Sequence, residues 1–221
     1  MVDCGQSPSW PYDMRAHAAP LSFEMSYGRE RLFVNCGSHP VDGDWREALR
    51  STPAHSALAM DARNACEIKP SGHFARKVQQ PHILREDLKS AILLEASHDG
   101  YVQLNGFTHK RRLYVSEQGH DVRGEDILSA PVEPASVIDV AVRFHLHPKV
   151  MVSLIRDGQE ALLRMPGGVG WRFHHQGGVL ALEDSVYLGQ GRQPRKTKQL
   201  AIYGLISDKQ ALIKWAVQRE G

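Results

Sequence analysis

Apolar residues recur at every second position along two stretches of the chain. In LSFEMSY, Leu21, Phe23, Met25 and Tyr27 alternate with serine and glutamate, and VIDVAVRFHL at 137–146 repeats the pattern. Side chains of a β-strand point alternately to opposite faces, so this spacing predicts strands with one buried face. After Gly28, RLFVN returns as the second strand of a hairpin. The alternation therefore predicts a fold built from sheets.

Shorter strand candidates follow at close and regular spacing. They are FARKVQQ, AILLEAS, RRLYVSE, MVSLIR, EALLRM, WRFHHQ, VLALEDSVYL, QLAIYGLI and ALIKWAVQ. Turn sequences such as RDGQ, PGGVG and HQGG separate many of them. Many short strands predict an all-β sandwich or barrel rather than alternating strands and helices. One short helix is expected at 44–51, with Asp44 as its N-cap and Glu47 completing a capping box. EDLKSAILLEA fits a helix or a strand, and we favour a strand from Ala91.

Length and composition exclude several classes of protein. The 221 residues suit a single domain over 1–221, with 27 basic and 25 acidic side chains and a net charge of +2. A nucleic-acid binder would show a dense basic patch, and RQPRKTK at 192–198 is better interpreted as a solvated turn. We expect no nucleic-acid partner and no membrane span, since no apolar run reaches about 20 residues. The N-terminus lacks the features of a signal peptide.

The cysteines point to no metal or disulfide framework. Cys4, Cys36 and Cys66 stand far apart without a CxxC pair, so a thiolate zinc site is not expected. One disulfide bridge could form in an oxidising compartment. The chain also lacks GxSxG, a P-loop and GxGxxG, which removes the usual signatures of serine hydrolases and nucleotide-binding enzymes.

Three groups of histidines could carry chemistry. Hairpin pairing could bring His17, Asn35 and His55 together, as a zinc site or as ordinary hydrogen-bonded residues. His145 and His147 lie two residues apart on one strand face, as in a cupin-like metal site, although no carboxylate follows them. The stretch 97–116, SHDGYVQLNGFTHKRRLYVS, could hold an acidic sugar through its arginines, or could be a solvated hairpin.

Several motifs in a fixed order carry a resemblance to a known family. They are RAHAAPLSFEMSYGRERLFVNCG, WREALRSTPAHSAL, LEASHDGY, HKRRLYVS, VRGED, VRFHLHP and EDSVYLG. Together they resemble the C-terminal domain of heparinase II/III-like proteins of bacteria, from about Arg15 to Trp215. The resemblance implies an antiparallel stacked-sheet β-sandwich with one short helix.

The resemblance also implies a reaction class. Complete family members are polysaccharide lyases that cleave uronic-acid-containing polysaccharides, including glycosaminoglycans, by β-elimination. Their main catalytic acid and base lie in an α/α toroid domain, which this chain lacks. We therefore expect a β-domain that is inactive alone and needs a toroid domain or subunit. The alternative is a non-catalytic sugar-binding or cell-envelope assembly domain. The resemblance implies an acidic polysaccharide as partner and the cell envelope or periplasm as location.

The family motif HxHADxxSF can be compared residue by residue. His17 matches its second histidine, and Arg15 replaces the first, so Arg15 is expected to bind a substrate carboxylate rather than to act as a base. In the family, His17, a strand-ending aspartate and a later histidine hold zinc. Here Asn35 stands at the aspartate position and His55 matches the last histidine. Because an amide replaces an anionic ligand, we expect the three side chains to lie close together and to bind zinc weakly.

Overall fold

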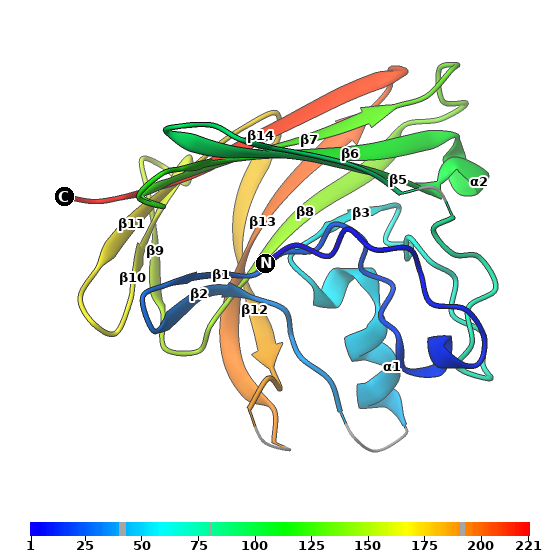
Figure 1. Cartoon of the computed structure of the whole chain (residues 1–221), viewed down its shortest axis with the longest axis horizontal. Coiled ribbons are helices and arrows are strands. Elements are labelled where there is room, and N and C mark those ends of the chain that lie inside the picture. Colours follow the sequence, from blue (N-terminus) through cyan, green and yellow to red (C-terminus); the bar gives the residue numbers. More distant parts are fainter. Residues whose placement is uncertain (40–42, 80, 191–192) are drawn as a thin grey trace.

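The computed structural model describes residues 1–39, 43–79, 81–190 and 193–221 as two stacked antiparallel sheets. Figure 1 shows the larger sheet above the smaller one, with the short helix α1 beside the smaller sheet. This confirms the predicted β-sandwich with one short helix. None of the described helices is long and apolar enough to cross a membrane.

Each sheet has a simple strand order. The smaller sheet runs β1-β2-β8-β13-β12, with β3 also paired to β8. Its strands are β1 (Met25–Tyr27), β2 (Glu30–Val34), β3 (Leu58–Met60), β8 (Ile138–Leu146), β12 (Val179–Tyr187) and β13 (Arg195–Ile206). The larger sheet runs β4-β5-β6-β7-β14-β11-β10-β9. Its strands are β4 (His82–Asp87), β5 (Ala91–Tyr101), β6 (Phe107–Ser116), β7 (Asp121–Ser129), β9 (Met151–Ile155), β10 (Glu160–Arg164), β11 (Gly170–Gln176) and β14 (Gln210–Arg219).

Aromatic side chains fill the space between the two sheets. Phe144 from the smaller sheet packs 4.9 Å from both Phe173 and Trp215 of the larger sheet, measured between ring centroids. Phe23, from the N-terminal segment, stacks on Trp215 at 5.2 Å. Trp215 also lies directly over Gly124, where a Cβ atom would overlap its ring. The alternating apolar residues of the sequence therefore meet where the sheets face each other.

The helical elements lie along one side of the sandwich. They are η1 (Tyr12–Arg15), α1 (Asp44–Arg50), η2 (Thr52–Ala54) and α2 (Val102–Asn105). The expected capping box is wrong, because Gly43 is the N-cap and no side chain makes a capping bond. Asp44 and Glu47 instead lie in the first helical turn, where their negative charges favour the positive end of the helix dipole.

Two strand predictions were wrong in position. The expected strand at 21–27 is extended only from Met25, because Leu21 has a φ of 58° in the left-handed region. FARKVQQ is not a strand over its described residues, and Phe74 pairs only through an isolated bridge to Ile68. Its Arg76 turns inward and donates to the carbonyls of Asn64, Ala65 and Gly100.

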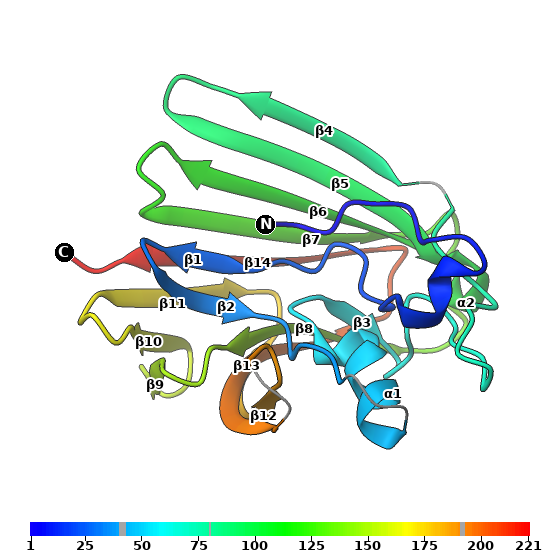
Figure 2. The same ribbon diagram turned by 60° about the horizontal axis from the view of Figure 1, so that its bottom comes forward.

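Among the remaining predictions, one strand start is confirmed and two strands were missed. Strand β5 begins at Ala91 as expected, whereas β3 and β4 were not predicted. All six residues of β4 are exposed, and Figure 2 shows the β4–β5 hairpin at the outer edge of the larger sheet. In the 192–198 stretch, Arg192 lies outside the described residues, and β13 begins at Arg195.

Candidate functional site

Two of the predicted site histidines are joined by a direct hydrogen bond. His17, just after η1, places its Nδ1 atom 2.8 Å from Nε2 of His55, which follows η2. The two rings meet edge to face, with centroids 4.9 Å apart. Nδ1 of His55 lies 2.8 Å from the Ser51 carbonyl oxygen. The segments that follow η1 and η2 thus bring together residues that are 38 positions apart.

The partners fix the tautomers of this pair. A carbonyl oxygen only accepts, so Nδ1 of His55 carries a proton and donates to Ser51. In a neutral ring Nε2 of His55 is then the acceptor, and Nδ1 of His17 donates to it. Nε2 of His17 is therefore the unprotonated nitrogen of the pair. The arrangement leaves one imidazole lone pair available for a ligand or a proton.

Burial keeps both imidazoles neutral. It lowers the pKa of His55 to about 3, with the neighbouring His17 adding to the effect. The pKa of His17 is also lowered, first by burial and then by the positive charge of Arg50, while the Leu49 carbonyl partly offsets both. His17 is consequently a weak base that stays unprotonated at neutral pH.

Asn35 lies beside this pair but bonds to the backbone. Its Oδ1 accepts the Ser56 N–H at 2.9 Å, and its own N–H donates to Oε1 of Glu24 at 3.0 Å. Asn35 therefore holds the chain on the C-terminal side of His55. The structure brings His17 and His55 into contact and places Asn35 against the next residue along the chain.

Arg15 and His17 line a cavity of about 310 Å³. The other described lining residues are Ser38, His39, Arg46 and Arg50, and none of these described residues is a carboxylate. Arg50 is buried and holds the surrounding loops, donating to the carbonyls of Ala16 at 2.7 Å and Gly72 at 2.8 Å. Arg15 ends η1 and is exposed. We call this cavity the arginine recess, and its charge suits an anionic group.

The residues present do not fit a zinc ion. In their hydrogen-bonded arrangement, His17 and His55 offer one free lone pair, and Asn35 offers an amide oxygen already bonded to Ser56. Among the described residues the recess has no anionic side chain, and Arg50 lies close enough to depress the pKa of His17. Zinc favours imidazole, thiolate and carboxylate donors. Weak zinc binding nevertheless stays a prediction for metal analysis.

The stretch 97–116 lies mostly in the paired strands β5 and β6, and several of its polar side chains are buried. His98, His109 and Arg111 are buried on β5 and β6. Nε2 of His109 and Nε of Arg111 both lie 2.8 Å from Oδ1 of Asp126 on β7, while Trp215 donates to Oδ2 at 3.0 Å. Burial raises the pKa of Asp126, but the charge of Arg111 and the hydrogen bond from His109 outweigh burial and hold this pKa well below its usual range. This cluster is a buried ion pair that joins three strands and the core.

His145 and His147 share a sheet face but have separate partners. Nε2 of His145 donates to the Pro53 carbonyl at 2.9 Å, so its Nδ1 accepts from the Ser185 hydroxyl at 2.8 Å. Burial lowers the pKa of His145 to about 4. The ring of His147 instead packs 5.2 Å from that of Tyr187. Within the described part of the chain, no three histidine, cysteine or acidic side chains gather as a metal-binding group.

The fold and the arginine recess define a two-sheet antiparallel β-domain with neutral histidines and a cationic cavity. The family described as "Heparinase II/III-like, C-terminal" matches residues 1–216. The chain therefore belongs to the heparinase II/III-like family, as the motifs predict. The match covers almost all of the chain, including Arg15, His17, Asn35 and His55.

Known relatives are considerably longer than this chain. FtsZ-localized protein C from Caulobacter vibrioides (strain NA1000 / CB15N) is 30% identical over 236 residues, which cover 99% of this chain and 40% of that protein. The heparan sulfate lyase HepC from Pedobacter heparinus superposes with a TM-score of 0.75 at 13% identity, covering 92% of this chain and 31% of that one. Heparinase III, the BT4657 gene product, superposes with a TM-score of 0.74 at 15% identity, covering 100% of this chain and 35% of that one. At these identities the solved structures establish the fold.

Proposed function

We propose that this chain is the polysaccharide-binding β-domain of a heparinase II/III-like protein of the cell envelope or periplasm. It binds a uronic-acid-containing polysaccharide, and β-elimination takes place only together with an α/α toroid domain or subunit. The arginine recess carries this proposal, since its described lining residues include arginines and no carboxylate. The length of the relatives supports a function shared with a further domain.

Arg15 is the residue through which we expect the polysaccharide to be recognised. Arg15 is the last residue of η1 and lines the recess. Its guanidinium makes no hydrogen bond or ion pair with another described residue. A guanidinium can donate two parallel hydrogen bonds to one carboxylate. Arg50, by contrast, has its Nε and Nη2 donors occupied by backbone carbonyls and contributes mainly positive charge.

The recess is poorly equipped for elimination by itself. The reaction needs a base for the C5 proton, an acid for the leaving oxygen and stabilisation of the enolate charge. Arginine stays protonated and cannot serve as the base. His17 has a free lone pair, but its lowered pKa makes it a weak proton acceptor. Arg15 could stabilise negative charge, so the chain supplies binding and leaves proton transfer to another domain.

A second candidate function is assembly without catalysis. FtsZ-localized protein C matches 99% of this chain, and its name places it with a cell-division protein. In that role the recess would hold an envelope polysaccharide as an anchor. Elimination activity of this chain combined with its toroid partner favours the lyase function. Polysaccharide binding with no product under the same conditions favours the anchor.

Calorimetric titration with a tetrasaccharide of uronic acids tests the proposal. Wild type should bind, and Arg15→Gln should bind about tenfold more weakly, because a charged hydrogen bond contributes roughly 1.5–3 kcal/mol. Arg15→Lys should recover only part of the loss, since lysine keeps the charge but not the paired donors. Arg164→Gln, at an exposed arginine on β10, is the matched control. Equal binding by wild type and Arg15→Gln would contradict the role of the recess.

A further inference from the structure

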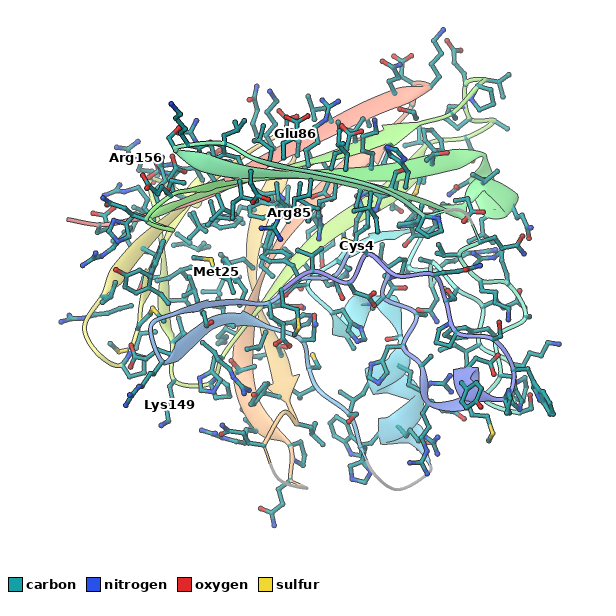
Figure 3. All side chains as sticks on the ribbon, in the orientation of Figure 1. Cys4, Met25, Arg85, Glu86, Lys149 and Arg156 are labelled. Atoms are coloured by element: carbon teal, nitrogen blue, oxygen red, sulfur yellow. The ribbon has the colours of Figure 1, made fainter. Side chains whose placement is uncertain are left out.

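A second cationic cluster lies where β2, β8, β12 and β13 end near one another. Tyr187 is the last residue of β12 and is paired with Arg195, the first residue of β13, so both side chains share one sheet face. Arg31 of β2 donates to the Tyr187 hydroxyl at 2.6 Å. The ring of His147, just after β8, packs on Tyr187 at 5.2 Å. With Lys149, which Figure 3 shows at the outer edge of the molecule, these residues form what we call the Tyr187 cluster.

Tyr187 and His147 each have a proton to donate and no acceptor among the described residues. Tyr187 and His147 are 1% and 7% exposed. The Tyr187 oxygen accepts from Arg31, which has no lone pair to offer in return, so the hydroxyl proton is unused. Nδ1 of His147 accepts the Lys149 N–H at 3.4 Å, which places the ring proton on Nε2. No described residue accepts from either group.

The charges around these two donors are all positive. The pKa of His147 is lowered by burial and then by Arg195, Arg31 and Lys149, and no acidic group offsets them. Within the described part of the chain, none of these three cations forms an ion pair with a carboxylate. Glu30, the acidic neighbour of Arg31 on β2, accepts the Gly167 N–H instead, at 2.8 Å.

Buried donors normally have acceptors, and clustered cations normally have counter-charges. An oxyanion would supply both, because its oxygens accept several hydrogen bonds at once. Gly189 packs tightly against the end of the Tyr187 ring, because a Cβ atom at position 189 would lie only 2.3 Å from the hydroxyl oxygen. We propose that the Tyr187 cluster binds one oxyanion group, such as a sulfate, phosphate or carboxylate, either as a free ion or as part of a saccharide.

This site is separate from the arginine recess. No residue of the Tyr187 cluster lines the recess, and the recess is formed by η1, α1 and their neighbouring loops. The inference does not depend on the proposed function, since it follows from unpaired donors and charges alone. Loss of binding in one site should leave the other intact, so the two proposals can fail independently.

Calorimetry at low ionic strength, with sodium sulfate or sodium phosphate against a chloride background, tests the site. Wild type should bind either ion, and Tyr187→Phe and Arg31→Gln should each weaken binding about tenfold through loss of one charge-assisted hydrogen bond. Arg164→Gln, the exposed arginine of β10, should bind as wild type does. A sulfated disaccharide and its unsulfated form, titrated in parallel, separate a free ion from a saccharide group.

A nuclear magnetic resonance titration of His147 keeps the test independent of folding losses in the variants. Bound sulfate should raise the pKa of His147 in the wild type, because an anion beside the ring favours its protonated form. His175, on β11, is the internal reference and should not respond to sulfate. The proposal is overturned if neither ion binds wild type, if both variants bind equally well, or if the pKa of His147 is insensitive to sulfate.

Discussion

Buried histidines in this chain act as neutral hydrogen-bonding groups. His55, His98, His109 and His145 are all inside the protein, and burial is the first cause of each lowered pKa. Their ring nitrogens meet a backbone carbonyl (His55 and His145), a hydroxyl (His145), a carboxylate (His109) or another imidazole (His55, His98 and His109). Their number in the sequence therefore reflects internal hydrogen bonding more than metal chemistry.

We predict that these histidines make the fold sensitive to mild acid. In the unfolded chain a histidine takes up a proton near pH 6.5, whereas folded His145 resists protonation until about pH 4. Its contribution is present above pH 6.5 and is lost as pH falls toward 4, by about 3 kcal/mol at most. Denaturant unfolding between pH 7 and pH 4 should show this loss. His145→Gln should flatten the slope, while the exposed His82→Gln should not. A wild-type free energy of unfolding that is flat over this range would refute the prediction.

We also predict that the His17–Asn35–His55 group binds zinc weakly. Asn35→Asp should raise zinc affinity clearly, because a carboxylate adds an anionic ligand beside two imidazoles. His17→Ala in that background should abolish the gain. Metal analysis and calorimetry on wild type and both variants provide the measurement. Tight stoichiometric zinc in wild type would contradict weak binding, and no gain in Asn35→Asp would show that the three residues do not form one site.

At the level of elements, the buried ion pair of Arg111 and Asp126 fastens the larger sheet to the core. Asp126 on β7 receives hydrogen bonds from β6 and from Trp215 of β14, and Arg111 reaches the carbonyls of Leu21 and Ser56. The N-terminal segment is thus tied to the larger sheet through one guanidinium. The sequence shows these residues only as a polar stretch around a turn.

Removing the charge of Asp126 should therefore be costly. Asp126→Asn leaves Arg111 buried without its counter-charge, and we expect a loss of about 3–5 kcal/mol in the free energy of unfolding. Asp184→Asn, which breaks the exposed pair with Lys198, should cost less than about 1 kcal/mol. Urea unfolding at pH 7 compares the two variants. A similar small effect for both would show that the buried pair does not stabilise the fold.

The sequence predicts long strands better than short connections. Alternation located β8, and turn residues separated most strands of the larger sheet, because period and turn chemistry are local properties. The short β3 has three buried residues and no alternation, and β4 is exposed on both faces, so neither carries that signal. FARKVQQ alternates like a strand, but Arg76 is bonded to three carbonyls in the interior.

For the whole molecule, the candidate site was only partly visible in the sequence. Motif positions indicated His17, Asn35 and His55, yet the tautomers and the bond from Asn35 to Ser56 depend on the folded turns. The Tyr187 cluster was missed, since its members come from four separate strands or strand ends. The HLH motif indicated His147 as a candidate residue. The contact between the rings of His147 and Tyr187 could not be predicted from sequence spacing.

We propose that this chain binds uronic-acid polysaccharide and does not cleave it without a further domain. Proton nuclear magnetic resonance of a uronic-acid tetrasaccharide incubated with the chain tests both parts in one sample. We predict saturation transfer from the protein to the sugar-ring protons, with no growth of the olefinic signal that β-elimination creates. Growth of that olefinic signal with the chain alone would place the chemistry on this domain, and an absence of saturation transfer would show that it does not bind the polysaccharide.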